Sequence, residues 1–269
     1  MRHCHDITGV PGAAARWIPL RWPRATPRTA PHMVVRALAC SALALSIPCA
    51  FGQDTGSALL RIGRNDLCVT NGIVSTLPNG LLATDTPSSR AVMLKKAEQV
   101  AEIRFRYMGA TPTSRPLASG ELRRQIGLKL RAQDTCNLIY VMWRIEPDAA
   151  IAVSIKRNPG RHTHEQCGAG GYSNIKPQRR INPPPIRPGE THTLRAELHG
   201  SDLTVATDGK VAWQGALGNE PAQLDGLIGF RTDNARFEFE YYADHLSALR
   251  AKEERAPNSA TRCVISEGD

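Results

Sequence analysis

The sequence predicts an all-β protein built as a sandwich of two antiparallel sheets. From residue 67 onward, short runs of alternating apolar and polar residues follow one another, with turn residues between them. The 19 prolines and 22 glycines suit such a turn-rich chain. No run has the apolar period of a helix of three turns. Hydrophobic residues make up 41% and charged residues 22%, so a packed core can form.

The clearest strands form a central group and a closing group. The central group is predicted over 98–107, 124–133, 136–146 and 151–157. The closing group is predicted over 192–199, 202–207, 210–215, 227–231 and 235–242, and shorter strands over 67–70, 73–76, 80–84 and 90–94. Asp208-Gly209 lies between two apolar runs and predicts a tight hairpin, because this pair tolerates positive φ angles. A short terminal helix is expected around 243–254.

The amino end predicts export. Residues 33–52 read as a signal peptide, because Arg36 precedes an apolar run over 37–47 and Ala50 and Gly52 place a cleavage site before Gln53. The run is shorter than the roughly 20 residues of a membrane-spanning helix, so no stable membrane insertion is expected. A buried helix of the mature domain is the alternative. We therefore expect a secreted or periplasmic protein.

Residues 1–32 show neither helical nor strand periodicity and predict a non-native or disordered extension, with a basic targeting extension as the alternative. The mature part, 53–269, is then expected to be a single β-sandwich domain. Six arginines and one aspartate in 1–52 account for +5 of the net charge of +9. The modest charge that remains, together with export, disfavours nucleic acid as a partner.

Four cysteines remain after export, and they predict two disulfides in an oxidising compartment. Three pairings are open, and we favour Cys136 with Cys167 and Cys68 with Cys263. The absence of a C-x-x-C pair argues against a zinc site. The run from His162 to Cys167 could hold a metal in isolation, but a loop disulfide is favoured. No metal or other cofactor is predicted, and a structural calcium is left open.

A long loop is predicted over 158–190, where six prolines and five glycines leave little strand potential. Loops of this length are usually functional or disordered. The predicted disulfide through Cys167 favours an ordered cover over part of the domain.

The closing half carries a family resemblance. A strand ends in His199-Gly200, the Asp208 hairpin leads to Trp213, and 226–234 read G-L-I-G-F-R-T-D-N. These features resemble the concanavalin A-like lectin/glucanase sandwiches, which include laminin-G-like domains. The resemblance implies a jelly roll, with carbohydrate binding, glycoside hydrolysis or polysaccharide lysis in different branches, among which the fold alone does not choose.

The enzymatic branches match less well. The E-x-D-x-x-E run of the hydrolases, whose paired acids would protonate a leaving oxygen and activate water, is missing from the sequence. Glu238 and Glu240 share a strand face, which we interpret as solvated. The lyase branch is represented only by fragments at 119–123 and 125–127, and Gly127 stands where a histidine would be expected.

Strand alternation predicts a candidate binding face. The apolar positions of the central strands form the expected core, and the opposite positions collect cations, an amide and an aromatic ring. If these strands are neighbours, the predicted ligand-binding residues are Arg104, Arg106, Gln125, Lys129, Arg131, Tyr140, Arg144 and Lys156. Arginine can fork onto a carboxylate or sulfate, and a ring can lie against a sugar. A polar outer surface without a ligand is the alternative.

These patterns favour a secreted protein that binds an anionic polysaccharide. A polysaccharide lyase or glycoside hydrolase on the same scaffold is the first alternative, and an envelope protein without a small ligand is the second. For a lyase, the catalytic candidates are Tyr140, Tyr172, His162 and His164, with Arg144 or Gln125 neutralising the carboxylate. The sugar and the oligomeric state are not specified by the sequence.

Overall fold

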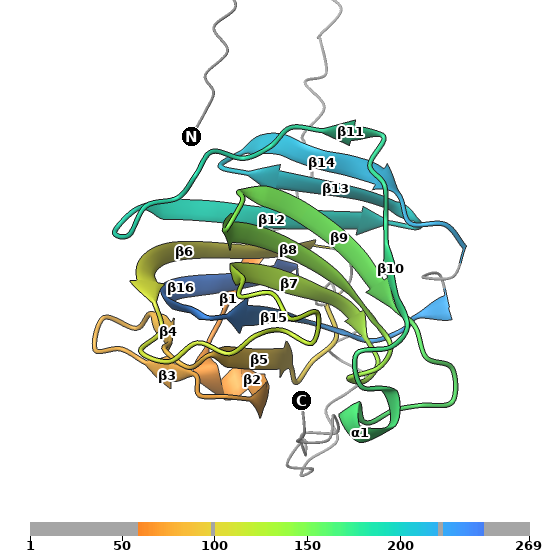
Figure 1. The fold of residues 1–269 in the computed structure, drawn as a ribbon, viewed down its shortest axis with the longest axis horizontal. Helices are drawn as coiled ribbons and strands as arrows, with labels where there is room; N and C mark the ends of the chain where they lie inside the picture. The colour runs from red at the N-terminus through yellow and green to blue at the C-terminus, as the bar shows by residue number, and fades with distance from the viewer. Residues whose placement is uncertain (1–58, 98–99, 220–222, 245–269) are drawn as a thin grey trace, which may run out of the picture. The chain divides into compact units, whose positions relative to one another are not determined.

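The computed structural model describes residues 59–97, 100–219 and 223–244, and these form two stacked antiparallel sheets (Figure 1). Sheet A has the order β11-β14-β13-β12-β6-β16-β4-β3, and β1 also pairs with β16. Its strands are β1 (Leu59–Ile62), β3 (Ser75–Thr76), β4 (Leu82–Thr84), β6 (Val100–Ala110), β11 (Arg179–Arg180), β12 (Thr191–His199), β13 (Asp202–Thr207), β14 (Lys210–Ala216) and β16 (Ala235–Asp244).

Sheet B has the order β10-β9-β8-β7-β15-β5-β2. Its strands are β2 (Leu67–Asn71), β5 (Ser88–Met93), β7 (Arg124–Ala132), β8 (Leu138–Glu146), β9 (Ala150–Lys156), β10 (Tyr172–Asn174) and β15 (Leu227–Asp233). The pairings between described strands are antiparallel. The predicted all-β, two-sheet sandwich is therefore confirmed.

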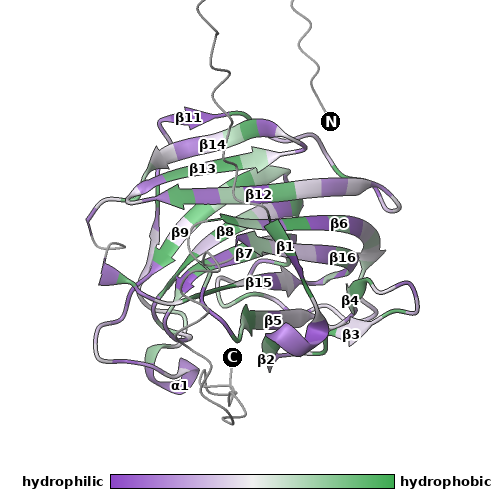
Figure 2. Ribbon diagram, turned by 180° about the vertical axis from the view of Figure 1, so that it is seen from behind, coloured by the Kyte–Doolittle hydropathy of each residue, from purple (hydrophilic) through white to green (hydrophobic). Residues whose placement is uncertain are grey.

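Turn chemistry fixes the register of the closing strands. Asp208 has φ 49° and Gly209 has φ 75°, so both central residues of the β13–β14 hairpin take the left-handed conformation predicted from the sequence. Thr207 and Lys210 then pair across the turn. Leu203 and Val205 of β13 consequently face the core, and a bulge follows between Val205 and Ala206. Figure 2 shows hydropathy alternating along β12.

The core lies between the sheets and is crossed by aromatic contacts. Phe105 of β6 packs edge-on against Trp143 of β8, with ring centroids 5.5 Å apart, and against Phe237 of β16 at 5.6 Å. Phe230 of β15 meets Phe239 of β16 at 4.9 Å. These rings are at most 1% exposed. Edge-to-face pairs therefore join residues of sheet A to residues of sheet B.

The central strands do not all belong to one sheet. The chain between β6 and β7 crosses from sheet A to sheet B, so β6 lies between β12 and β16, whereas β7, β8 and β9 are neighbours in sheet B. The predicted core positions of these strands are buried. Arg104 and Arg106, however, are exposed on the outer face of sheet A. The expectation of a single cationic face is therefore wrong for these two residues.

The segment 158–190 contains short elements that the sequence did not indicate. They are α1 (His164–Cys167), β10 and β11. Strand β10 extends the edge of sheet B and β11 extends the edge of sheet A, so the segment passes from one sheet to the other. The 3-10 helix Arg64–Asp66 and β1 were also not predicted.

The predicted Cys136–Cys167 disulfide is present, with the two Cα atoms 5.9 Å apart. Cys68 is also disulfide-bonded. Its predicted partner Cys263 lies outside the described residues, as do the extension 1–32, the predicted signal peptide 33–52 and most of the helix expected over 243–254. Within the described chain, no helix has the length and apolar character needed to cross a membrane.

Replacing Phe105 with alanine should lower the free energy of unfolding by about 3–5 kcal/mol, because the change leaves a cavity between Trp143 and Phe237. Urea denaturation measures this loss. The control is Ile73→Ala, since Ile73 is 62% exposed and its truncation should change stability by about 0.5 kcal/mol or less. Similar losses in the two variants would contradict the assignment of Phe105 to the core.

Candidate functional site on the outer face of sheet B

A cleft of about 460 Å³ lies on the outer face of sheet B, above β15 and β5. Its strand residues are Ser88, Arg90, Arg231 and Asp233, which we call the floor. Asn71 comes from the end of β2, His164 from α1 and Tyr172 from the edge strand β10. The loops around the cleft contribute Gly72, Thr86, Pro87, Arg115, Pro116, Leu117, Ala118, Gly168 and Ala169. Five separate parts of the chain thus meet at one region of the sheet.

The floor holds an arginine in a fixed orientation. Arg231 Nε donates to Asp233 Oδ2 at 2.7 Å and Nη2 donates to Oδ1 at 3.1 Å, while Gln125 Nε2 donates to Oδ2 at 2.6 Å. The Asp233 side chain is 1% exposed and that of Arg231 is 12% exposed. Burial alone would lower the pKa of Arg231, but the Asp233 carboxylate outweighs it and the pKa is raised. The guanidinium therefore remains charged at the base of the cleft.

Asn234 anchors one wall of the cleft. It follows Asp233 directly and has φ 53°, a left-handed conformation that asparagine tolerates. Its side-chain oxygen accepts from Arg115 N at 2.8 Å, and Nδ2 donates to Arg115 O at 2.8 Å and to Arg123 O at 3.2 Å. The loop that carries Arg115 is thereby attached to the turn that ends β15.

The facing wall is attached to the β7–β8 hairpin. The Cys136–Cys167 disulfide joins the hairpin to α1. Asn158 Nδ2 donates to Cys136 O at 3.1 Å, and Asn137 Nδ2 donates to Arg161 O at 2.8 Å. These contacts attach residues 158–167 to the β7–β8 hairpin. They also fix His164, which lines the cleft from α1.

Tyr172 presents an aromatic ring at the edge of the cleft. Its ring stacks on that of Tyr140, with centroids 6.1 Å apart and an interplanar angle of 22°. Lys156 Nζ lies 5.4 Å from the Tyr172 ring centroid, and Arg231 Cζ lies 5.3 Å from that of Tyr140. Tyr172 is 43% exposed and Tyr140 is 3% exposed. Of these two rings, it is Tyr172 that can reach a ligand.

Besides Tyr140, three of the predicted ligand-binding residues are buried. Gln125, Lys129 and Lys156 are at most 4% exposed, although alternation places them on the outer side of the sheet. Gln125 is hydrogen-bonded to Asp233, and Lys156 donates to Thr135 O at 3.0 Å. The expectation that this face is open at these positions is therefore wrong.

The two other arginines predicted on this sheet differ from each other. Arg131 has φ 48° and breaks the strand alternation, and its Nη2 donates to Gly200 O in the β12–β13 turn of sheet A at 2.9 Å. Arg144 stays on the outer face and is partly buried. Of the predicted set on sheet B, Arg144 thus remains a candidate for direct contact.

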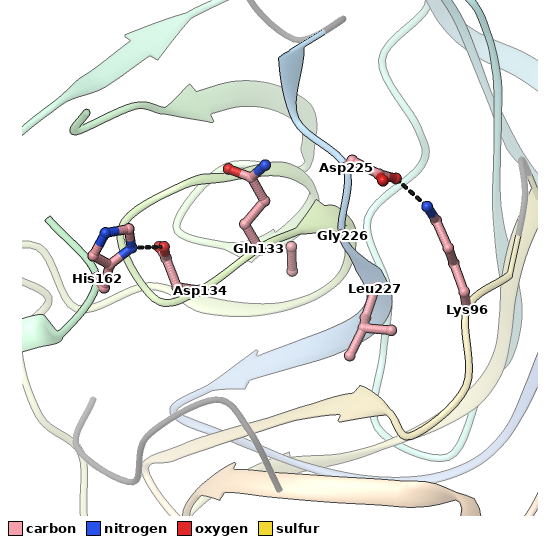
Figure 3. Close-up of a pocket in the computed structure, with 8 residues that line it drawn as sticks. Lys96, Gln133, Asp134, His162, Asp225, Gly226 and Leu227 are labelled. Carbon is pink, nitrogen blue, oxygen red and sulfur yellow. Dashed lines mark hydrogen bonds and ion pairs between the residues drawn. The ribbon is translucent and has the colours of Figure 1, made fainter. Parts of the chain in front are cut away.

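The predicted catalytic candidates are divided between two cavities. His164 and Tyr172 line the cleft, whereas His162 lines another cavity of about 460 Å³ at the other end of β15. There His162 Nδ1 lies 2.8 Å from Asp134 Oδ2, and Lys96 pairs with Asp225 (Figure 3). Tyr140 lies beneath Tyr172. In the described part of the chain, no three His, Cys, Asp or Glu side chains are grouped to hold a metal.

Glu238 and Glu240 lie on the outer face of sheet A, away from the cleft. Glu240 pairs with Arg61 at 3.4 Å and with Arg104 at 3.6 Å. The interpretation of this strand face as solvated and charged agrees with these pairs.

Sequence reasoning missed Arg90, Arg115, Arg231, Asp233 and Asn234. The last three belong to the R-T-D-N run that carried the family resemblance, so the sequence did contain a signal at these positions. Arg90 lies in a strand and Arg115 in a loop, and neither belongs to a sequence motif that would indicate a binding site.

Comparison with known proteins gives similarity in fold. No protein-family model matches the chain, and no curated protein does. Among solved structures, the carbohydrate-binding module CBM66 from Bacillus subtilis has a TM-score of 0.47 and 14% identity, over 65% of this chain and 91% of the module. The Caenorhabditis elegans galectin LEC-6 has a TM-score of 0.36 and 7% identity, over 68% and 99%.

A tetrameric galectin from the sponge Cinachyrella has a TM-score of 0.38 and 10% identity, over 59% of this chain and 100% of the galectin. The fold assignment itself depends on the sheet topology, and these similarities transfer no ligand to the present chain.

Removing the disulfide by the double change Cys136→Ala and Cys167→Ala should lower the free energy of unfolding by about 3 kcal/mol, because it releases a loop closed over 31 residues. Hydrogen exchange should become faster in 158–171 and stay unchanged in β12 and β13. Unchanged exchange in 158–171 would show that the hydrogen bonds of Asn137 and Asn158 alone hold this wall.

Proposed function

We propose that this protein is a glycan-binding β-sandwich that takes an acidic sugar into the cleft on sheet B. The observation that carries the proposal is the composition of the cleft. The described residues that line it include three arginines, Arg90, Arg115 and Arg231, and one carboxylate, that of Asp233. The exposed ring of Tyr172 lies at the same cleft.

The chemistry of these side chains suits a uronate or a sulfated sugar. A guanidinium donates two parallel hydrogen bonds to a carboxylate or sulfate, and such charge-assisted bonds are the stronger ones in proteins. A tyrosine ring offers a flat apolar surface to a sugar and a hydroxyl at its edge. Because Asp233 fixes Arg231 in advance, less side-chain freedom is lost on binding.

Export of the protein is part of the same proposal. The Cys136–Cys167 disulfide suits an oxidising compartment. The apolar run over 37–47 with its basic flank supports cleavage of residues 33–52 as a signal peptide. A protein located in the periplasm or outside the cell would meet acidic polysaccharides there.

A polysaccharide lyase is the second candidate, because His164 and Tyr172 line the same cleft as the arginines. In a β-elimination on a uronate, one of these groups would take the proton next to the carboxylate and the other would protonate the leaving oxygen. Arg231 would neutralise the charge that develops on the carboxylate. Incubation with a panel of polyuronates tests this: unsaturated products that absorb in the ultraviolet support the lyase, and binding without products supports the lectin.

Binding is tested by calorimetry with polygalacturonate and alginate, with a neutral glucan as the comparison. Arg115→Gln and Tyr172→Ala should each weaken binding of the acidic polymer about tenfold or more. The Asn234 bonds to residue 115 use its backbone, so the change leaves the wall attached. Lys210→Gln, which removes one exposed cation from the β13–β14 turn of sheet A, should bind as the wild type does.

Failure of the wild type to bind any acidic or neutral glycan would reject the proposal and favour an envelope protein without a small ligand. Equal weakening in Lys210→Gln and Arg115→Gln would show that attraction to the overall charge, and not the cleft, accounts for binding.

A further inference from the structure

A group of arginine side chains, which includes Arg144, lies beside the cleft. Arg144 projects from β8 on the outer face of sheet B, and its Nε is buried without a hydrogen-bond partner among the described residues. A buried donor that lacks a partner is uncommon, because losing its water costs free energy. Such a donor requires an explanation.

The surroundings of Arg144 are basic. Burial lowers the pKa of Arg144, the charge of Arg123 lowers it further, Glu121 raises it, and Arg180 of β11 again lowers it. Glu121 is itself paired with Arg123 and accepts a hydrogen bond from Ser119. Because the folded-state pKa lies below its ordinary value, the charge on Arg144 reduces the stability of the folded protein at neutral pH.

Arg144 lies on the same face of sheet B as the cleft, two strands away from β15. Arg144 pairs in register with Gln125 of β7, and Gln125 pairs with Asp233 of β15. The three residues form one row across neighbouring strands, so Arg144 and Asp233 are about 10 Å apart along the sheet. Asp233 orients Arg231 in the floor of the cleft.

We propose that Arg144, Arg123 and Arg180 form an anion site that binds a second carboxylate or sulfate group of the same acidic glycan. The inference deepens the proposed function and rests on it for the identity of the ligand. An anion at this position would give the buried Nε an acceptor and would offset the repulsion between the three guanidinium groups. Arg144 belongs to β8, Arg123 directly precedes β7 and Arg180 belongs to β11. Although they are distant in the sequence, the charges of Arg123 and Arg180 both act on Arg144.

This arrangement selects the class of glycan. Two anion positions separated by about two strand spacings fit a polymer that carries acidic groups at regular intervals, whereas a single acidic sugar can occupy only one of them. The expected ligand is therefore a polyanionic chain and not a glycan with one terminal acid.

The first experiment uses inorganic sulfate as the probe. Thermal unfolding is recorded in sodium sulfate and in sodium chloride at equal ionic strength for the wild type, Arg144→Gln, Arg144→Lys and Lys210→Gln. Sulfate stabilises proteins in general by exclusion from their surface, so only the difference between variants is informative. The wild type and Lys210→Gln should gain more in Tm than Arg144→Gln, with Arg144→Lys between them.

In chloride, Arg144→Gln should unfold at the same temperature as the wild type or above it, because the substitution removes repulsion between like charges. Equal sulfate responses of all variants would overturn the anion site. If Arg144→Gln fails to fold, Arg123→Gln and Arg180→Gln carry the test, since either change removes one of the three cations and should reduce the sulfate response.

The second experiment measures affinity for galacturonate oligomers of increasing length. Arg144→Gln should weaken binding of the longer oligomers about tenfold and leave binding of the monomer unchanged. Equal affinity of wild type and variant for long oligomers would overturn the assignment of this site to the glycan. A sulfate response that depends on Arg144, together with no binding of any glycan, would keep the anion site and reject the proposed function.

Discussion

The turn from β15 to β16 connects the architecture to the site, and most of the cleft depends on it. Asp233 ends a strand of sheet B and fixes Arg231, while Asn234 turns the chain toward sheet A and carries the loop with Arg115. Asn234 N also donates to Pro87 O at 2.8 Å, and Thr111 N donates to Asn234 O. One turn thus joins the sheets, closes one end of the sandwich and positions the floor and one wall of the cleft. The left-handed φ of Asn234 is the local strain that this arrangement requires.

Strand positions could be predicted because alternation is a local property of the chain. Burial of one side of a strand forces apolar residues to every second place, as at Ile126, Leu128 and Leu130. The Asp208 hairpin and the Cys136–Cys167 pair could also be predicted from the sequence, since each depends on residues whose chemistry admits few alternatives. The strands that pair with β6 could not be predicted, because alternation specifies the face on which a residue lies and not the neighbouring strand.

The solvent exposure of residues on the outer face of sheet B could not be predicted from the local sequence pattern either. Lys129 and Lys156 point outward by parity, yet both are at most 2% exposed. Lys156, Tyr172, Tyr140 and Arg231 form a column in which two stacked rings lie between two cations, and Tyr172 comes from the segment that crosses between the sheets. The column needs a long-range contact between β10 and the strands before it, so it emerges only from the folded structure. It makes part of this face a second, partly polar layer of packing.

Two arginines on this face illustrate different uses of the same side chain. Arg231 is compensated by Asp233, which keeps its charge and fixes its direction, so it can orient a ligand without attracting one strongly over distance. Arg144 lies among further cations, and its charge reduces stability until an anion arrives. A surface that combines both should bind quickly through the cluster of Arg144, Arg123 and Arg180, which keeps an excess of positive charge beside Glu121, and in one orientation through the Arg231–Asp233 pair. The first contribution weakens as salt is added, because screening acts on exposed charge, whereas the buried pair is protected from it.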